Sequence, residues 1–262
     1  MQLVTQLKRE RLYVKALGAS YVLSRRTVEP GLCSARTRYG VLYFRPADSD
    51  LLTFWYTLGA GEYSLARFGH HAAIVTAAYD RILAQGKTPL IVDAGANIGA
   101  ASVWFAQQFP KARIVAVEPD PMNARICRLN TQGRNVEVVE AAIGARPGSV
   151  SLIAAEESWG VQTVRGGDVP IVTIPQLIDR VENSELLIAK VDIEGFESDL
   201  FAEETDWIQK PTAIFLEPHD WMLPGRGTSR SFRQAIGPEF EMLISGENLI
   251  FVRCGQPADH RN

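Results

Sequence analysis

The 262-residue sequence has few cysteines and no apolar run of the roughly 20 residues that a membrane-spanning helix needs. Cys33, Cys127 and Cys254 are far apart without metal-ligand spacing, so we expect neither a zinc site nor a disulfide framework. Isolated thiols fit a reducing compartment, and we expect a cytoplasmic protein that is not integral to a membrane. The net charge of −3 argues against a nucleic-acid partner, because phosphate binding depends on Lys and Arg.

From Lys87 onward, apolar runs typical of buried strands alternate with helix-like stretches. This alternation predicts an α/β fold with a doubly wound, mostly parallel, seven-stranded sheet, closed at one edge by an antiparallel hairpin. The strands are expected within residues 89–95, 112–119, 135–144, 186–192, 212–219, 240–246 and 247–254.

Two parts of the chain fall outside this alternation. Residues 1–86 are less regular, and we expect a helical cap with a strand pair over the ligand end of the sheet of the main domain, residues 87–262. Residues 148–156 and 169–174 are expected to form an extra hairpin around a polar insert, 155–170. The oligomeric state stays open, a homo-oligomer included.

The stretch LIVDAGANIGA, residues 90–100, runs from a buried strand into a glycine turn at the ligand edge of the sheet. Gly95 and Gly99 would let a ligand approach the backbone, but the third glycine of a dinucleotide site is missing. Asp93 is expected to point its carboxylate into the site, where it would repel a pyrophosphate and attract a sulfonium. The turn therefore favours S-adenosylmethionine over a dinucleotide.

Glu118 ends the second strand, 25 residues after Asp93, where an acidic side chain would bind both ribose hydroxyls of an adenosine. Glu118 has an alternative role in starting the next helix together with Asp120 and Pro121. Ala142, after the third strand, would offer a small side chain beside the adenine.

These stretches, VDAGANIG, AVEPDP, AAIG, KVDIEGFE and LEPH, resemble the FkbM-type S-adenosylmethionine-dependent methyltransferases. The resemblance extends from about Tyr43 to the end of the chain and includes FRPADSDLLTFWYTLGAGEY upstream of the main domain. It implies the class I, Rossmann-like methyltransferase sheet and O-methylation of a hydroxyl on a sugar or polyketide-like natural product. The expected donor-binding residues are Asp93, Gly95, Asn97, Gly99, Glu118, Pro119, Ala142, Asp192 and Tyr63.

The reacting end of the site is expected at the ends of the strands that carry KVDIEG and LEPH. Lys190, Asp192 and Glu194 share one face by period-two alternation, and such charges are costly unless paired or used. We interpret Lys190 as the ion-pair partner of Asp192, and Glu194 either as a substrate contact or as the start of the following helix.

His219 is the expected general base, since imidazole titrates near neutrality. Asp192 and Glu217 would complete the catalytic set, with Glu217 orienting the ring or pairing with Lys190. The same chain stretches offer ligands for a divalent cation, namely Asp192, Glu194, Glu217 and His219. Lys190 and the positive donor also account for these carboxylates, so a metal ion is not favoured.

Two outer segments are expected to complete the acceptor side. Ser49, Asp50 and Glu62 either close over the ligands or cap their own loops. Trp221 and Arg226 lie in a lid-like segment and are expected to contact a polar acceptor.

The sequence thus predicts methyl transfer from S-adenosylmethionine to a hydroxyl oxygen of a small acceptor. Two alternatives remain: a non-catalytic donor-binding module that acts through a partner, and a nicotinamide-dependent oxidoreductase, which the missing glycine disfavours. Nitrogen or carboxylate acceptors stay open because the chemistry at sulfur is the same.

Overall fold

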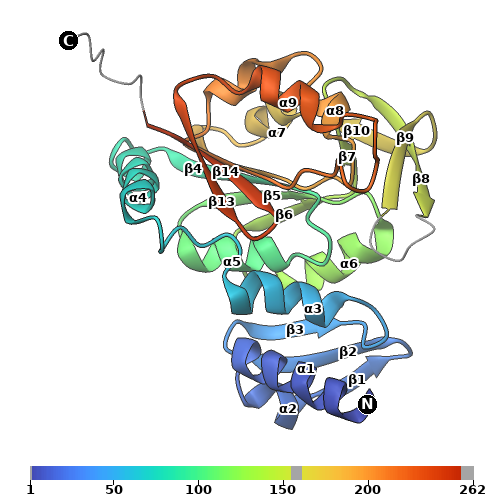
Figure 1. The fold of residues 1–262 in the computed structure, drawn as a ribbon. Coiled ribbons are helices and arrows are strands. Elements are labelled where there is room, and N and C mark those ends of the chain that lie inside the picture. The colour runs from blue at the N-terminus through green and yellow to red at the C-terminus, as the bar shows by residue number, and fades with distance from the viewer. Residues whose placement is uncertain (1, 155–160, 255–262) are drawn as a thin grey trace.

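The structure, a computed structural model, describes residues 2–154 and 161–254 and is built around one seven-stranded sheet. The strand order is β13-β14-β12-β11-β4-β5-β6, with β12, β11, β4, β5 and β6 parallel and β14 antiparallel to both of its neighbours (Figure 1). The strands are β4 (Thr88–Ala94), β5 (Arg113–Val117), β6 (Val136–Val139), β11 (Ser184–Val191), β12 (Ala213–Leu216), β13 (Phe240–Ser245) and β14 (Asn248–Arg253).

Helices cover both faces of this sheet, which confirms the predicted doubly wound fold. Alternate residues of β4 divide between the two faces: Leu90 and Val92 pack towards α7, whereas Ile91 packs towards α4 and α5. The helices of the main domain are α5 (Ala100–Gln108), α6 (Pro121–Asn130), α7 (Ile174–Asp179), α8 (Glu197–Leu200), the short η2 (Thr205–Gln209) and α9 (Ser229–Ala235), and α4 (Gly69–Ala84) precedes the first strand.

Local sequence signals fix where two of these helices begin. Asp120 accepts a hydrogen bond from the Asn123 amide, and Pro121 occupies the first turn of α6, as expected. Thr173 and Gln176 form a reciprocal capping box at the start of α7.

The N-terminal segment packs on α5 and α6 and shares a hydrophobic core with them (Figure 1). It contains a three-stranded antiparallel sheet where a strand pair was expected, and Glu62 in its last loop feels the charge of Asp192 at the ligand edge. Asn130 of α6 holds this layer through hydrogen bonds with the Tyr43 backbone and with the Ile98 carbonyl. Its elements are α1 (Gln2–Leu17), α2 (Ser20–Ser24), β1 (Arg26–Glu29), β2 (Leu32–Thr37), β3 (Gly40–Phe44), α3 (Asp50–Phe54) and the π-helical turn η1 (Trp55–Ala60).

The two stretches predicted to form an extra hairpin do pair antiparallel, as part of a second sheet of four strands. The expected strand 135–144 is in fact two, because the chain leaves the main sheet after β6 and pairs again in this second sheet. The order is β7-β10-β8-β9, formed by β7 (Ala142–Ile143), β8 (Gly148–Ala154), β9 (Val161–Arg165) and β10 (Val169–Val172). The N-terminal part of the polar insert, residues 155–160, lies outside the described residues.

Within the described ranges, no helix combines the length and apolar character needed to cross a membrane. The thiols of Cys33, Cys127 and Cys254 are free.

Candidate functional site

The carboxyl ends of four neighbouring parallel strands bring the predicted residues to one edge of the sheet. Gly95 follows β4, Glu118 follows β5, Asp192 follows β11 and Glu217 follows β12. The connections from β4 and β11 leave in opposite directions, so the sheet has its switch point between these two strands. Ligands of open α/β sheets bind at such a point.

Contacts with neighbouring segments of the chain require glycine in this turn, whether or not a ligand binds there. Gly95 has a φ of +77°, and a Cβ there would lie 1.7 Å from the Asp192 carbonyl oxygen. A Cβ on Gly99 would lie 2.8 Å from the sulfur of Cys127. The turn therefore requires glycine at both positions. Asn97, between them, has a φ of +49° and an exposed side chain.

Asp93 does not point into the open site, which corrects our expectation. Its side chain is fully buried, and Oδ2 accepts a hydrogen bond from Ser102 Oγ at 2.6 Å. Oδ1 lies 3.4 Å from Lys190 Nζ. The reason is packing: α5 covers this face of β4 and seals the carboxylate beneath the glycine turn.

Lys190 connects the buried Asp93 with the edge of the sheet. Its Nζ lies 3.2 Å from Asp192 Oδ2, which confirms the predicted ion pair, and donates to the Gly95 carbonyl at 2.7 Å. Burial disfavours the ammonium form, but Asp192, Tyr63 and Asp93 outweigh it and hold the pKa of Lys190 well above its usual value. Lys190 is thus a permanent positive charge under the site.

Glu118, after β5, faces the glycine turn that follows the neighbouring strand β4. One carboxylate oxygen accepts from the Asn97 amide at 2.7 Å and the other accepts from the Asp120 amide at 2.9 Å. Burial raises the pKa of Glu118 to about 7 despite these two hydrogen bonds. Glu118 therefore braces both the turn and the start of α6, and each of its oxygens keeps capacity for a further donor.

His219 lies at the centre of a group of carboxylates. Its Nδ1 is 2.7 Å from Oε1 of Glu197, whose side chain is 1% exposed. Its Nε2 lies 3.6 Å from Asp192, 3.7 Å from Glu194 and 3.9 Å from Glu217. Glu197 therefore orients the ring. The sequence had suggested Glu217 for this role.

This environment changes the protonation that we expected of His219. Burial disfavours the imidazolium, but the hydrogen-bonded Glu197, Asp192 and Glu194 outweigh it and raise the pKa of His219 to about 9. The ring is positively charged at neutral pH and has no free lone pair to accept a proton. This raised pKa differs from the expected titration near neutrality.

The pKa values of the surrounding carboxyl groups are raised as well, which for an acid favours the uncharged form. Burial and the neighbouring Asp192 raise the pKa of Glu217 to about 8 and that of Glu194 to about 7. Glu194 does not start a helix, since its φ is +53° and α8 begins at Glu197. These acids are stronger proton acceptors than ordinary carboxylates once ionised.

Part of this group has the spacing of a cation site. One ligand atom each of Asp192, Glu194 and His219 lie within 4.8 Å of one another, and Glu217 lies next to them. Oxygen and imidazole nitrogen ligands suit Mg²⁺, Mn²⁺ or Zn²⁺.

Several residues predicted for the ligands instead support the fold. Tyr63 is packed among Trp104, Phe105 and Phe215 in the core. The carboxylate of Asp50 is bound by the Arg45 side chain and backbone amide, and the carbonyl of Ser49 accepts amide hydrogen bonds at the start of α3.

The remaining predicted residues differ in how far they can meet a ligand. Ala142 is buried in β7, and Pro119 is half-buried beside Glu118. Trp221 and Arg226 are exposed on the segment after β12.

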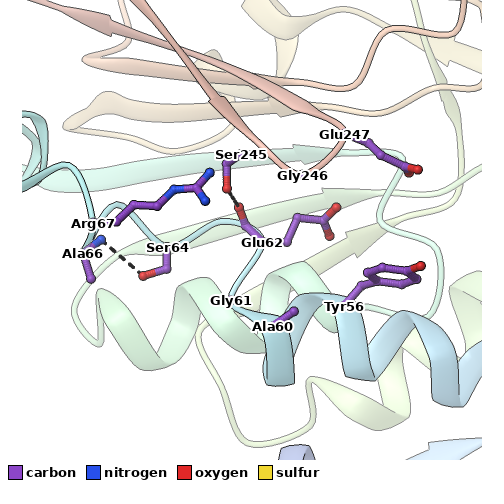
Figure 2. A pocket seen from close by; sticks show the side chains of 10 residues that line it. All are labelled: Tyr56, Ala60, Gly61, Glu62, Ser64, Ala66, Arg67, Ser245, Gly246 and Glu247. Carbon is purple, nitrogen blue, oxygen red and sulfur yellow. Dashed lines mark hydrogen bonds between the residues drawn. The ribbon is translucent and has the colours of Figure 1, made fainter. Parts of the chain in front are cut away.

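A cavity of about 610 Å³ lies between the loop after η1 and the turn that joins β13 to β14 (Figure 2). Its position was not predicted, because no local pattern relates two segments that are 180 residues apart. Glu197 was also missed as a partner of His219, although it closes the KVDIEGFE stretch. The lining residues are Tyr56, Ala60, Gly61, Glu62, Ser64, Ala66, Arg67, Ser245, Gly246 and Glu247.

Comparison with known proteins identifies the family. Residues 93–245, which include the glycine turn, the Lys190 cluster and His219, match the methyltransferase FkbM domain. The chain belongs to the FkbM methyltransferase family. It is 27% identical to the 2-O-methyltransferase NoeI of Sinorhizobium fredii over 188 residues, 62% of this chain and 76% of NoeI. It is 35% identical to methyltransferase sdnD of Sordaria araneosa over 68 residues, so the match spans 26% of that relative.

Solved structures are less similar. Cofactor-bound Rv0187 from MTB aligns at a TM-score of 0.41 and 13% identity, covering 81% of this chain and 100% of that one. M. capricolum TrmK in complex with S-adenosylhomocysteine aligns at a TM-score of 0.39 and 8% identity, covering 70% of each chain.

Proposed function

We propose that this FkbM methyltransferase moves a methyl group from S-adenosylmethionine to a hydroxyl oxygen of a small acceptor. The observation that carries the proposal is the group around His219 at the switch point of the sheet, next to the glycine turn. The relative NoeI, named a 2-O-methyltransferase, supports an oxygen acceptor.

The chain's own residues fit an adenosine-containing donor. The turn at Gly95 to Gly99 exposes Asn97, and Glu118 keeps acceptor capacity for ribose hydroxyls. Bound at this place, the donor supplies an electrophilic methyl on a positive sulfur. Asp192, which follows β11, is the carboxylate that would offset this charge, because Asp93 is sealed away.

Calorimetry with S-adenosylhomocysteine tests the donor site. We expect binding to the wild type and at least tenfold weaker binding to Glu118→Ala, because a charged hydrogen bond contributes about 1.5–3 kcal/mol. Glu140→Ala removes an exposed carboxylate from the end of β6 and serves as the matched control. Heat with NAD instead of S-adenosylhomocysteine would favour the oxidoreductase alternative.

At the acceptor side, Glu217 is the residue proposed to take the proton. With the donor bound, an acceptor hydroxyl that attacks the methyl carbon would lose its proton to the Glu217 carboxylate, and the electron pair of the broken carbon–sulfur bond would stay on sulfur. His219 stays protonated and holds Asp192, Glu194 and Glu217 in place through its charge. A protein that bound the donor without turning over any acceptor would point to the non-catalytic module.

We propose that this chemistry proceeds without a metal ion. The imidazolium of His219 already supplies positive charge where a cation would bind, and a divalent ion would have to displace its proton. Turnover is expected to be unchanged, within twofold, after dialysis against EDTA and assay in metal-free buffer. Loss of turnover that is restored by added Mg²⁺, Mn²⁺ or Zn²⁺ would contradict this.

A further inference from the structure

Three side chains that are far apart in the sequence meet at the edge hairpin of the main sheet. His71 lies in the first turn of α4, Glu241 is the second residue of β13, and Cys254 directly follows β14. One atom of each, an imidazole nitrogen, a carboxylate oxygen and the thiol sulfur, lies within 4.8 Å of the other two. His71 Nε2 and Glu241 Oε2 are 2.7 Å apart. The fold thus gathers nitrogen, oxygen and sulfur donors from three elements.

The register of the hairpin explains why these groups face one another. Glu241 lies opposite Val252 in the antiparallel pair, and Cys254 lies two residues further along, on the same face. Cys254 packs against the hydrophobic core that α4 also covers, and Figure 1 shows α4 next to the end of β14. Arg67 Nη2 donates to the Ile244 carbonyl at 2.6 Å and ties the chain before α4 to β13. The backbone therefore holds the three donors in place.

The thiol distinguishes this cluster from the group around His219. In the described part of the chain, two groups of three side chains have ligand atoms this close, and the other group, Asp192, Glu194 and His219, has oxygen and nitrogen donors. Mg²⁺ and Ca²⁺ prefer oxygen ligands, whereas Zn²⁺ binds thiolate, imidazole and carboxylate. The donor set with sulfur therefore selects zinc.

The spacing also suits a tetrahedral zinc ion. Bonds of about 2.0–2.3 Å at the tetrahedral angle place ligand atoms roughly 3.3–3.6 Å apart. The three donors are within about an ångström of this arrangement. The Glu241 side chain is 60% exposed, so its carboxylate is free to make the rotation that the metal requires.

We infer that His71, Glu241 and Cys254 form a zinc-binding site that links α4 to the β13–β14 hairpin, with water in the fourth position. Cys254 binds as the thiolate, and its proton passes to solvent when the zinc binds. The spacing of the cysteines along the chain had predicted no zinc site. It does not reveal this one because the fold brings in His71 and Glu241, which are 170 residues apart.

The zinc site and the His219 group lie at opposite edges of the sheet. Val252, near the end of β14, pairs with Ala213 at the start of β12, whereas Glu217 follows the end of β12. Zinc at this place stabilises the fold and takes no part in methyl transfer. The inference therefore goes beyond the proposed function and does not depend on the donor or the acceptor.

Cobalt(II) tests the site because it replaces zinc and its spectrum reports a thiolate ligand. The full chain, without a polyhistidine tag, is dialysed against EDTA, freed of the chelator and titrated with Co²⁺. We expect an equimolar amount of Co²⁺ to give a thiolate-to-cobalt charge-transfer band in the near ultraviolet, and Zn²⁺ to abolish it. Cys254→Ser should lose this band. Cys33→Ser, which changes a free thiol of β2 outside the cluster, is the matched control and should keep it.

Calorimetric titration with Zn²⁺ measures the affinity. His71→Ala and Glu241→Gln are each expected to weaken it at least tenfold, since even the partners of metal ligands contribute about 10–100-fold. His70→Ala removes the exposed neighbouring imidazole and should change the affinity by less than threefold. Free Zn²⁺ at about a hundred times its Kd should raise the Tm of the wild type by about 5–10 °C and leave that of Cys254→Ser unchanged.

The inference is overturned if Co²⁺ binds without the thiolate band, or if Cys254→Ser binds Zn²⁺ as tightly as the wild type does. It is also overturned if His70→Ala weakens binding as much as His71→Ala, which would indicate adventitious binding to exposed imidazoles. Loss of Co²⁺ binding in Asp192→Asn would place the cation at the His219 group instead. The proposed function is judged separately, by binding of S-adenosylhomocysteine and by turnover.

Discussion

Replacement of Lys190 by methionine is expected to lower the free energy of unfolding by about 3–5 kcal/mol. Lys190 is 2% exposed. It lies between Asp93, which is fully buried, and Asp192. Without the ammonium, Asp93 keeps a buried charge whose only other described side-chain partner is Ser102. The loss is large because it leaves a charge uncompensated, not because the ion pair itself contributes much stability.

Equilibrium urea unfolding measures this loss, and a thermal shift of about 2–4 °C for each kcal/mol should accompany it. Lys87→Met is the matched control, since Lys87 pairs with Glu185 at the surface, and it should cost at most about 1 kcal/mol.

A double-mutant cycle with Asp93→Asn isolates the pair. The amide keeps an acceptor for Ser102 and removes the charge, so Asp93→Asn together with Lys190→Met should be less destabilising than the sum of the single changes. Strict additivity would show that the two side chains do not depend on each other.

Glu217→Gln is expected to reduce turnover by about 10²–10⁴-fold, the contribution typical of a positioned base. The glutamine has nearly the same size but cannot accept the acceptor's proton. Affinity for S-adenosylhomocysteine should change by less than twofold, because Glu217 follows β12, on the other side of the switch point from the glycine turn after β4. Glu203→Gln removes a surface carboxylate that pairs with Arg146 and should leave turnover unchanged.

The pH profile of the wild type is a second readout of the same assignment. Turnover requires Glu217 without its proton, so activity should be lost as the pH falls below about 8, the value to which burial and Asp192 raise the pKa of Glu217. It also requires protonated His219, so activity should decline again above about 9. A bell-shaped profile with a maximum between these values is expected.

Glu217→Gln should remove the lower limb of that profile from its residual activity. An unchanged lower limb in this variant, or full activity far below pH 7 in the wild type, would exclude Glu217 as the base. Activity that rises once and then stays level above pH 9 would show that His219 works without its proton, as the sequence first suggested.

Much of the fold and the location of the site could be predicted from local patterns. Alternation of apolar runs with helix-like stretches predicts the doubly wound sheet, because parallel strands need crossover helices. Residues that end parallel strands must share one edge, so Asp192, Glu217 and Glu118 could be grouped without coordinates. The period-two spacing of Lys190 and Asp192 predicts their ion pair for the same reason.

Predictions of what each side chain does at that edge were less successful. The position of Asp93 near the end of a strand predicts that it lies near the ligand edge. The packing of α5 turns its carboxylate towards Ser102 and Lys190. The break of the expected third strand into β6 and β7 likewise depends on pairing with β10, a partner that period-two spacing does not reveal.

The sequence by itself determined the sheet, the family and the edge at which the candidate site lies, because periodicity and strand-end positions are local properties of the chain. Only the tertiary structure decided the raised pKa of His219, its hydrogen bond to Glu197 and the cavity beside Glu62. These depend on burial and on charges brought together from distant segments, and a pKa or a cavity is set by all the neighbours at once.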